Sequence, residues 1–262
     1  MTRELSPVET AKAAAGRRSV DFIEDGMRVG LGTGSTAAFM VRALGERVRK
    51  EGLNITGVPT SSQTAELARQ EGIRVVALDE AKWLDLTIDG ADEFDGDLNL
   101  IKGGGGALLQ EKIVATASDR MIVIADLAKE VACLGAFPLP IEVVPFGWKT
   151  TKLLVEEALD PLDVLGREVT LRMSGDRAFI TDNGNHILDL HLGRIADARQ
   201  LGHMLNQIPG VVENGLFIDI CDMVVIGHGD GRVEVRDYST GDVEKGRIDF
   251  PEPDNIFTDI GS

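Results

Sequence analysis

The sequence predicts an α/β protein in which a parallel sheet domain carries a small inserted α+β domain. Over the first half of the chain, segments with helical periodicity alternate with short apolar runs, a pattern typical of a parallel sheet. From about Cys133 the pattern changes to a β-α-β-β-β-α order with several prolines and a hairpin turn. With 262 residues, the chain suits one large domain or two unequal ones.

The first unit of the chain is a helix, a strand, a glycine turn and a second helix. Apolar residues at helical spacing predict a helix over residues 7–24, with Pro7 near its start. Residues 26–31 predict a turn and a short strand, and residues 37–49 form an amphipathic pattern that predicts the next helix. Strand, glycine turn and helix together form the first half of a βαβ unit.

The glycine turn of this unit carries hydroxyl side chains. Its spacing Gly30-x-Gly32-x-Gly34 resembles a dinucleotide fingerprint, which also requires an acid at the end of the next strand. That strand is predicted over 53–58, and the Pro59-Thr-Ser-Ser that follows offers no carboxylate, so a nucleotide site is rejected. The hydroxyls either cap the next helix or bind a small polyol or phosphate. They belong to Thr33, Ser35 and Thr36.

The alternation continues through the middle of the chain. Apolar patterns predict a helix over 63–71 and strands over 73–77, 84–88 and 121–125. Ligands of open parallel sheets gather beyond the carboxyl ends of the strands. The loops after the first and fourth predicted strands are therefore candidates for a site, and they span residues 33–36 and 89–92.

Residues 85–112 combine several acids, a lysine and four consecutive glycines. The run Gly103–Gly106 has little use inside regular structure, and such glycines usually permit close backbone approach or positive φ. The residues after the run predict a helix over 107–116, whose first N–H groups are open to an anion. Lys102 stands directly before the glycines, and Glu111 lies near the start of the helix.

The second half of the chain predicts the small α+β domain and then a return to the main sheet. Strands are predicted over 141–144, 169–173, 178–181 and 187–190, and helices over 148–158 and 196–207. Asp182-Asn-Gly predicts a hairpin turn between the last two of these strands. Two further strands, over 216–220 and 223–227, are expected in the main sheet.

The predicted domains follow from this order. Residues 1–132 with 209–237 form the catalytic domain, residues 133–208 form the inserted domain, and residues 238–262 form an acidic tail. The tail has six acids, two bases and two prolines with little periodicity. It is either disordered or an arm laid over a neighbouring subunit, and its composition favours disorder.

The composition limits the partners. A net charge of −16 argues against nucleic-acid or anionic-membrane partners, which need a basic face, but it allows a small anionic ligand held by a few lysines. The N-terminus lacks an apolar leader segment and no stretch has transmembrane length, so we expect a cytoplasmic protein. The two cysteines, Cys133 and Cys221, stand apart among apolar neighbours and are expected to be buried and reduced.

The acids of the central stretch raise the question of a metal site. They are Asp85, Asp89, Asp92, Glu93, Asp95 and Asp97. In a calcium-loop frame, Thr87 takes the third position and Gly96 stands where a glutamate is required, so the template fails. No histidine lies nearby and no GxxxxGK[ST] loop exists. We therefore expect no metal and no cofactor, and we interpret Asp95 and Asp97 as a solvated turn.

An acid, a lysine, hydroxyls and helix N-termini without a metal suit a sugar phosphate. The helix N-termini and lysines bind the phosphate, and carboxylates bond sugar hydroxyls. A carboxylate in a dry position can remove a proton next to a carbonyl while a lysine stabilises the enediolate oxygen. Glu111 is the candidate base by its position. The alternative for Glu111 is an exposed helix residue beside Lys112.

Several motifs in order resemble ribose-5-phosphate isomerase of the A type. They are GTGST (32–36), DGADE (89–93), KGGGG (102–106) and EK (111–112). The resemblance continues through Lys129, PLPIEVVPF (138–146) and VVENGLF (211–217), and it covers roughly residues 5 to 236. The motifs are long and jointly specific. The tail after about residue 237 departs from the family pattern.

The resemblance implies metal-free interconversion of ribose 5-phosphate and ribulose 5-phosphate in the non-oxidative pentose phosphate pathway. Glu111 resembles the base that moves a proton between C1 and C2, Asp89 the carboxylate that assists ring opening, and Lys102 the lysine that stabilises the intermediate. The positions that match substrate-binding residues are Lys12, Thr33, Gly34, Ser35, Thr36, Asp89, Gly90, Ala91, Asp92, Lys102, Gly103, Gly104, Gly105 and Lys129.

The family fold implied by the resemblance is a Rossmann-like domain with an inserted ferredoxin-like lid, and members are commonly homodimers or homotetramers. Two other functions fit parts of the pattern. A sugar-phosphate deaminase or coenzyme A transferase shares this fold, but a transferase uses its glutamate as a nucleophile and needs a larger site. A non-catalytic sugar-phosphate sensor keeps the binding loops, loses the base and carries a DNA-binding module, which this sequence lacks.

Overall fold

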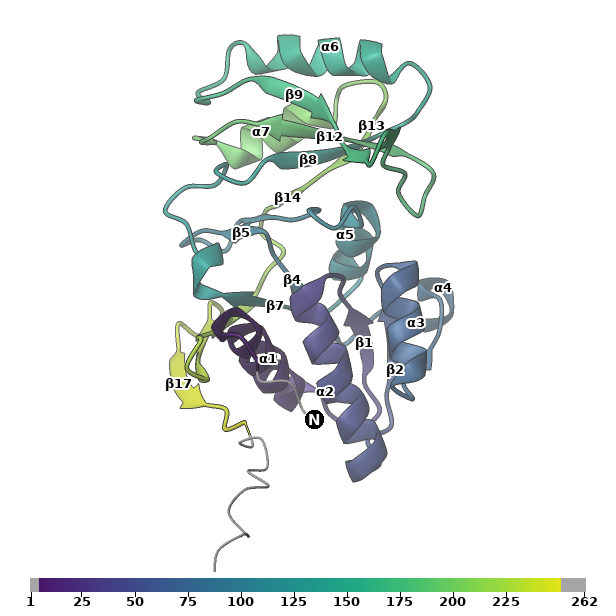
Figure 1. Ribbon diagram of the computed structural model, residues 1–262, viewed down its shortest axis with the longest axis vertical. Helices are drawn as coiled ribbons and strands as arrows, with labels where there is room; N and C mark the ends of the chain where they lie inside the picture. The colour runs from purple at the N-terminus through teal and green to yellow at the C-terminus, as the bar shows by residue number, and fades with distance from the viewer. Residues whose placement is uncertain (1–4, 251–262) are drawn as a thin grey trace, which may run out of the picture.

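The structure, a computed structural model, describes residues 5–250. It is an α/β fold with a mostly parallel main sheet and smaller antiparallel sheets. In Figure 1 the main sheet and its helices occupy the lower part of the molecule, and a four-stranded sheet with two helices stands above them. Within residues 5–250, no helix is both long enough and apolar enough to cross a membrane.

Eight strands make up the main sheet. They are Arg28–Leu31 (β1), Thr56–Pro59 (β2), Arg74–Val75 (β3), Leu86–Gly90 (β4), Met121–Asp126 (β7), Met223–Gly227 (β15), Arg232–Asp237 (β16) and Val243–Arg247 (β17). Their order is β17-β16-β15-β7-β4-β1-β2-β3, in which β15 to β3 are parallel and the last two strands of the chain add antiparallel. The parallel sheet predicted from the alternating pattern is confirmed.

Helices cover both faces of this sheet. They are Pro7–Ser19 (α1), Ser35–Glu51 (α2), Ser62–Gln70 (α3), Leu78–Ala81 (α4) and Leu108–Thr116 (α5). Alternate residues of β1 point to opposite faces, as the strand period requires. Val29 and Leu31 share a core cluster with Met40 of α2, whereas a Cβ on Gly30 would lie 2.7 Å from Val114 of α5.

Helix α1 is shorter than the helix predicted over 7–24. It begins with a capping box between Ser6 and Glu9 and ends at Ser19, after which a 3-10 turn, Val20–Phe22 (η1), follows. The Ser19 hydroxyl donates to the Gly16 carbonyl and so satisfies an acceptor of the last turn. Apolar periodicity continues through this turn, which explains the longer prediction.

The upper sheet forms a unit with its own core (Figure 1). Its elements are Leu139–Val143 (β8), Trp148–Leu159 (α6), Glu168–Leu171 (β9), His186–His191 (β12), Ala198–Leu205 (α7) and Val211–Asn214 (β13). The strand order is β13-β8-β12-β9, and every pairing is antiparallel. Residues 211–214, expected in the main domain, thus supply the fourth strand of this sheet.

The hairpin predicted between strands 178–181 and 187–190 is wrong. Strand Arg177–Ala178 (β11) pairs with Met173–Ser174 (β10) instead, while β12 pairs with β8 and β9. The Asp182-Asn-Gly segment does turn, because the Gly184 N–H donates to the Thr181 carbonyl. The residues before the turn do not form a ladder with β12: the Phe179 N–H donates to the Arg172 carbonyl, and the Thr181 hydroxyl donates to the buried Glu142 carboxylate.

Three very short strands lie between the two larger sheets. They are Glu93–Phe94 (β5), Leu100–Ile101 (β6) and Leu216–Phe217 (β14), in the order β14-β6-β5. The strand predicted over 216–220 therefore pairs with β6 and not with the main sheet. The strand predicted over 223–227 does return to the main sheet, where β15 pairs with β7.

The start of the C-terminal tail forms a strand that pairs with the main sheet of the same chain. Val243–Arg247 pairs with β16 along the edge of the main sheet, and the Glu244 carboxylate accepts from Arg18 of α1 at 2.9 Å. The disorder expected for 238–262 is thus wrong for this strand. All five of its residues are exposed, so it shows no apolar alternation in the sequence. Residues 251–262 lie outside the described part of the chain.

The cysteines differ from the expectation that both are buried. Cys133 is exposed, and its thiol contacts the carbonyl of Ile195 at 3.2 Å. Cys221 is half-buried, and burial raises the pKa of its thiol to about 12. Both thiols are free.

Gly227 tests how closely α1 packs on the main sheet. A Cβ at this position would lie 1.9 Å from the Ala11 carbonyl oxygen, which is backbone and cannot move aside alone. We expect Gly227→Ala to lower the free energy of unfolding by about 1–3 kcal/mol, the usual cost of overpacking. Urea denaturation measures the change. Gly96→Ala is the control, because a Cβ added there would have no atom within 4 Å, and an equal loss in both variants would contradict this packing.

Candidate active site

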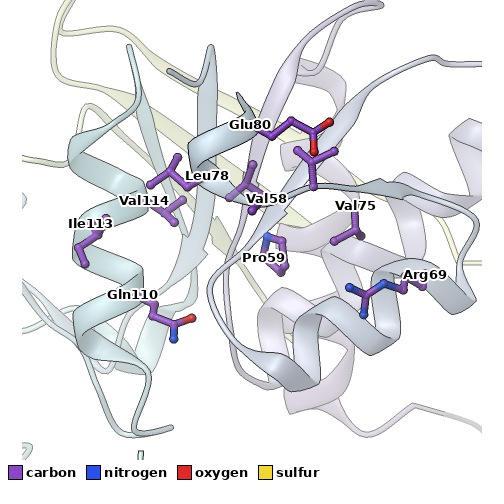
Figure 2. Close-up of a pocket in the computed structure, with 11 residues that line it drawn as sticks. Val58, Pro59, Arg69, Val75, Leu78, Glu80, Gln110, Ile113 and Val114 are labelled. Carbon is purple, nitrogen blue, oxygen red and sulfur yellow. The ribbon is translucent and has the colours of Figure 1, made fainter. Parts of the chain in front are cut away.

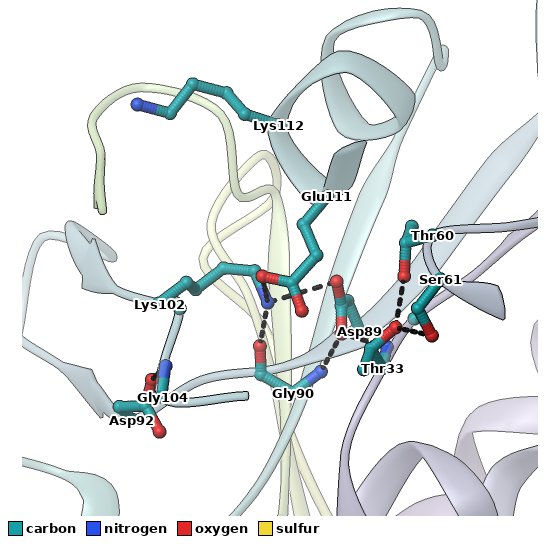
Figure 3. A network of polar contacts seen from close by, with 12 residues as sticks. Thr33, Thr60, Ser61, Asp89, Gly90, Asp92, Lys102, Gly104, Glu111 and Lys112 are labelled. Atoms are coloured by element: carbon teal, nitrogen blue, oxygen red, sulfur yellow. Dashed lines mark hydrogen bonds and ion pairs between the residues drawn. The ribbon is translucent and has the colours of Figure 1, made fainter. Parts of the chain in front are cut away.

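Asp89, Lys102 and Glu111 meet at one point although 22 positions separate the first from the last (Figure 3). The Lys102 ammonium lies 3.0 Å from Asp89 Oδ2 and 3.3 Å from Glu111 Oε2. All three side chains are buried, with exposed fractions between 0 and 5%. The sequence placed these residues in one motif block, and the structure brings them into direct contact.

Asp89 is held by the end of strand β4. Its Oδ1 accepts from the N–H groups of Gly90 at 2.7 Å and Thr33 at 3.1 Å. The close approach needs a glycine at position 32, because a Cβ there would lie 2.1 Å from Asp89 Oδ1. The carboxylate is therefore fixed in position by main-chain donors, and its Oδ2 faces Lys102.

Lys102 follows strand β6 and points toward the carboxyl end of β4. Its main-chain N–H donates to the Gly215 carbonyl at 2.9 Å, which ties it to the segment before β14. Its ammonium also donates to the Gly90 carbonyl and lies 5.4 Å from the centre of the Phe217 ring. Two carboxylates, a carbonyl and an aromatic face thus compensate the buried charge.

Glu111 lies in the first turn of α5 and points into the site. The alternative, in which it is an exposed neighbour of Lys112, is wrong because its exposed fraction is 4%. Lys112 points away from it (Figure 3). Its ammonium donates to Glu213 Oε1 at 2.9 Å and to the Asn214 carbonyl at 2.6 Å. Successive helix residues point in different directions, so Glu111 points into the site while Lys112 points toward strand β13.

Burial and the neighbouring charges shift the pKa values of the three groups. Burial raises the pKa of Glu111 to about 8, the Asp89 carboxylate adds to the rise, and Lys102 opposes it. Burial also raises the pKa of Asp89 despite its ion pair with Lys102. Burial alone would lower the pKa of Lys102, but the charges of Asp89 and Glu111 outweigh this effect and raise it. The ammonium therefore stays charged, and Glu111 can exchange a proton near neutral pH.

A cluster of hydroxyls lies beside Asp89. Thr33 Oγ1 contacts the hydroxyls of Thr60 at 2.7 Å, Ser61 at 2.8 Å and Thr64 at 3.1 Å (Figure 3). Thr33 follows β1 and the other three follow β2, so the neighbouring carboxyl ends of two parallel strands bring them together. Sequence reasoning noted the hydroxyls at 60–62 without placing them in the site, and it missed Thr64.

The N-terminus of α2 is open and has a lysine beside it. Its N-cap is Gly34, at φ +112°, so no side chain caps the first N–H groups. Lys12 of α1 donates to Ser35 Oγ at 2.9 Å, which places an ammonium next to this helix end. Thr36 is half-buried in the first turn. The hydroxyls of 35 and 36 therefore do not act as the N-cap, and the arrangement suits an anion.

The glycine run forms a tight turn before α5. Gly103 and Gly106 have φ values of +105° and +80°, which favour glycine. The Gly104 N–H donates to Asp92 Oδ2 at 2.7 Å, so this predicted contact residue lies against the run (Figure 3). Gly104 and Gly105 are exposed, and a Cβ on Gly105 would lie 3.8 Å from the Thr33 methyl group. The run thus faces the hydroxyl cluster.

The remaining predicted contacts are Gly90, Ala91 and Lys129. Gly90 touches Lys102 through its carbonyl, and Ala91 packs at the edge of a core cluster. Lys129 ends the 3-10 turn Leu127–Lys129 (η2) after β7, and its ammonium lies 5.9 Å from the centre of the Phe137 ring. It therefore stands at the carboxyl end of the strand next to β4.

The acids of residues 85–97 divide into separate structures. Asp85 lies before β4 and pairs with Arg28, at the end of the strand away from Asp89. Asp95 accepts from the N–H groups of Asp97 and Asn99 and forms the turn that was expected. Within residues 5–250, no group of three or more His, Cys, Asp or Glu side chains is arranged to hold a metal ion.

A cavity of about 530 Å³ lies between α5 and the part of the chain from β2 to α4 (Figure 2). Its walls come from β2, α3, the segment from β3 to α4, and α5. Gln110 lines it, whereas the neighbouring Glu111 side chain does not. The mostly apolar walls contain none of the residues predicted to bind or react with a substrate.

Comparisons with known proteins agree on one family. The sequence profile described as Ribose 5-phosphate isomerase A (phosphoriboisomerase A) matches residues 56–231. The chain is 72% identical to "Ribose-5-phosphate isomerase A" of Ruegeria pomeroyi over 260 residues, which are 99% of both chains. It is also 72% identical to the protein of that name from Cereibacter sphaeroides over 261 residues, 100% of both. These relatives extend through the tail, so the expectation that the tail departs from the family is wrong for them.

Solved structures give the same result. The structure of ribose 5-phosphate isomerase A from Methanocaldococcus jannaschii has a TM-score of 0.77 at 40% identity, covering 90% of this chain and 98% of that one. A D-ribose-5-phosphate isomerase in complex with phospho-erythronic acid has a TM-score of 0.79 at 41% identity, covering 92% and 99%. Sequence and structure together show that the chain belongs to the ribose 5-phosphate isomerase A family.

Proposed function

We propose that Glu111, Asp89 and Lys102 are the groups with which this chain interconverts D-ribose 5-phosphate and D-ribulose 5-phosphate, the reaction of its family. The observation that carries the proposal is the position of Glu111. Its carboxylate is buried on a rigid helix beside an ammonium, and burial raises its pKa to about 8. A base with a pKa near the working pH is suited to both accepting and returning a proton.

The reaction needs one proton to move between two adjacent carbons. Glu111 removes the proton from C2 of the open-chain aldose, and the C–H electron pair forms the C1–C2 double bond of a cis-enediolate. The C1 carbonyl oxygen takes up negative charge, which the Lys102 ammonium stabilises. Glu111 then returns the proton to C1 while a proton moves from the C2 hydroxyl to the C1 oxygen, and the ketose results. Asp89, next to Lys102, serves ring opening and the proton transfer between oxygens.

The phosphate is proposed to bind at the open N-terminus of α2. Unpaired N–H groups, the Lys12 ammonium and nearby hydroxyls offer charge and donors for it. The proposed ligand groups at this end belong to Lys12, Thr33, Gly34, Ser35 and Thr36. At the other end, sugar oxygens are proposed to contact Asp89, Gly90, Ala91, Asp92, Lys102, Gly103, Gly104, Gly105 and Lys129.

A bound acid in a relative supports a sugar-phosphate site. The solved isomerase that is 41% identical to this chain holds phospho-erythronic acid. This molecule carries a phosphate at one end and a carboxylic acid at the other, and a carboxylate resembles the charge of an enediolate. This chain has an open helix end and a buried ammonium, which are complementary to the same two charges.

We also propose that the upper sheet is a ferredoxin-like lid inserted in a Rossmann-like domain. The order β8-α6-β9-β12-α7-β13 and the antiparallel sheet β13-β8-β12-β9 support this division. The lid then ends after residue 214 rather than at 208. A homodimer or homotetramer and a cytoplasmic location stay predictions from the resemblance and the composition. Light scattering of the purified protein tests the first of them.

Turnover of ribose 5-phosphate by the purified protein after EDTA treatment tests the function itself. We expect ribulose 5-phosphate to form at the same rate with and without the chelator, because none of the proposed steps uses a metal. Activity that disappears and returns with magnesium would make the acidic stretch a metal site. Binding of ribose 5-phosphate without turnover would favour a sensor.

Replacing the proposed base separates chemistry from binding. Glu111→Gln keeps the size and hydrogen-bonding capacity of the side chain but cannot accept a proton. We expect kcat to fall by about a hundredfold or more, the usual contribution of a general base, while KM changes little. Steady-state kinetics measure both constants. A large rise in KM at unchanged kcat would show that Glu111 only binds substrate.

The raised pKa of Glu111 predicts the pH dependence of the reaction. The carboxylate is the active form, and with a pKa of about 8 it is mostly protonated at pH 6. We therefore expect kcat/KM to rise about tenfold per pH unit below pH 8 and to level off above it. Initial rates between pH 5.5 and 9.5 would reveal the profile. A profile that is already flat from pH 6 would contradict the assignment of Glu111 as the free-enzyme base.

A further inference from the structure

Arg172 of the upper sheet holds the glycine run of the active site. This residue lies between β9 and β10, and its Nη1 donates to the carbonyls of Gly103 at 2.7 Å and Gly104 at 3.0 Å. On its other side, Nε donates to Asp189 Oδ2 of β12 at 2.9 Å, and Nη2 donates to Oδ1. The Arg172 and Asp189 side chains are only 15% and 16% exposed. One guanidinium therefore joins the upper sheet to the glycine run.

The two carbonyl bonds fix the direction of the N–H groups that follow. In a planar trans peptide, the carbonyl and the next N–H point in opposite directions. With the Gly103 carbonyl on Arg172, the Gly104 N–H points to Asp92, and the observed bond is 2.7 Å. With the Gly104 carbonyl on Arg172, the Gly105 N–H also points away from the guanidinium. Among residues 5–250, the Gly105 N–H makes no hydrogen bond.

The glycine run needs such an anchor. Four glycines in succession have more conformational freedom than any other sequence, and two of them adopt positive φ. A second contact comes from the same unit: a Cβ on Gly106 would lie 2.4 Å from the ring of Phe179, so the ring rests directly on the main chain. Helix α5, which carries Glu111, begins two residues after Gly106.

We propose that Arg172, held by Asp189, is a positioning residue that fixes the glycine run so that the Gly105 N–H can donate to an oxygen of the sugar phosphate. The proposal rests on the proposed function, in which Gly103, Gly104 and Gly105 bind the substrate. Arg172 acts through the main chain and not on the reacting atoms. Its donors are already used by two carbonyls and a carboxylate.

Lysine cannot replace Arg172 in this arrangement. The guanidinium is planar and presents donors on two edges, so it binds the Asp189 carboxylate with one edge and the two carbonyls with the other. An ammonium is a single point with three donors and cannot span both sets. The arrangement of acceptors around residue 172 therefore requires arginine.

The test compares Arg172→Ala and Arg172→Lys with wild type by kinetics and by amide hydrogen exchange. We expect KM for ribose 5-phosphate to rise about tenfold in Arg172→Ala, the effect of one lost hydrogen bond of about 1.4 kcal/mol, while kcat changes by less than about threefold. Exchange in a peptide covering residues 102–109, followed by mass spectrometry without substrate, should become faster. Arg172→Lys should show most of both changes.

Arg167→Ala is the matched control. Arg167 also donates to main-chain carbonyls of the upper unit, those of Leu159, Asp160 and Leu162, but it does not touch the glycine run. We expect KM and the exchange of residues 102–109 to stay at wild-type values in this variant. Equal changes in Arg167→Ala and Arg172→Ala would mean that general loosening of the unit is responsible, and the proposal would be wrong.

Asp189→Asn tests the anchor without changing Arg172, and it serves if Arg172→Ala does not fold. We expect a smaller rise in KM from Asp189→Asn alone, and no further rise when it is combined with Arg172→Lys, because the two side chains act as a unit.

Unchanged KM and unchanged exchange in the Arg172 variants would overturn the proposal, as would a fall in kcat at constant KM. If wild type itself turns over no ribose 5-phosphate, the proposed function fails, and the exchange experiment still decides whether Arg172 holds the glycine run.

Discussion

The structure depends on one buried ammonium placed between two buried carboxylates. Ion pairs removed from water lose hydration energy that their mutual attraction regains only with good geometry and additional hydrogen bonds. Lys102 has such partners in Asp89, Glu111 and the Gly90 carbonyl. The three charges do not cancel, because two acids face one base. The surplus negative charge, together with burial, keeps Glu111 able to hold a proton near neutral pH, which a simple ion pair would prevent.

Two of these three charges lie on regular secondary structure of the main domain. Asp89 belongs to a central strand that is bonded on both sides, and its carboxylate is fixed by main-chain donors. Glu111 belongs to a helix packed against the same sheet. The glycine run, whose main chain has the greatest conformational freedom, contributes main-chain groups and no charged side chain. The glycine run therefore allows the backbone to approach a ligand closely, whereas the strand and the helix hold the charged side chains in place.

Much of the fold could be predicted from the sequence because its signals are local. Alternating apolar strands and amphipathic helices indicated the parallel sheet, and the motif block around Lys102 indicated the central residues of the site. The short strands β5 and β6 were missed because two residues cannot show a period, and the strand predicted over 216–220 was assigned to the wrong sheet. The burial of Glu111 and the role of Arg172 depend on distant segments: Arg172 is 68 positions from Gly104. Contacts between such distant segments cannot be predicted from a local sequence pattern. The exposed strand β17 shows no alternation of buried and exposed residues from which it could be predicted.

The edge strand β17 has a consequence for how the protein behaves at high concentration. A sheet edge exposes unpaired N–H and C=O groups that can pair with a second molecule and start aggregation. In this chain, β17 covers the edge of β16, whose Val233 and Val235 belong to the apolar interior. The new edge carries Glu244, Lys245 and Arg247, all exposed, and the opposite edge is the two-residue strand β3. The charged side chains of β17 and the short length of β3 leave few unpaired main-chain groups that could bond to another sheet. The edges of the sheet are therefore protected without a second molecule.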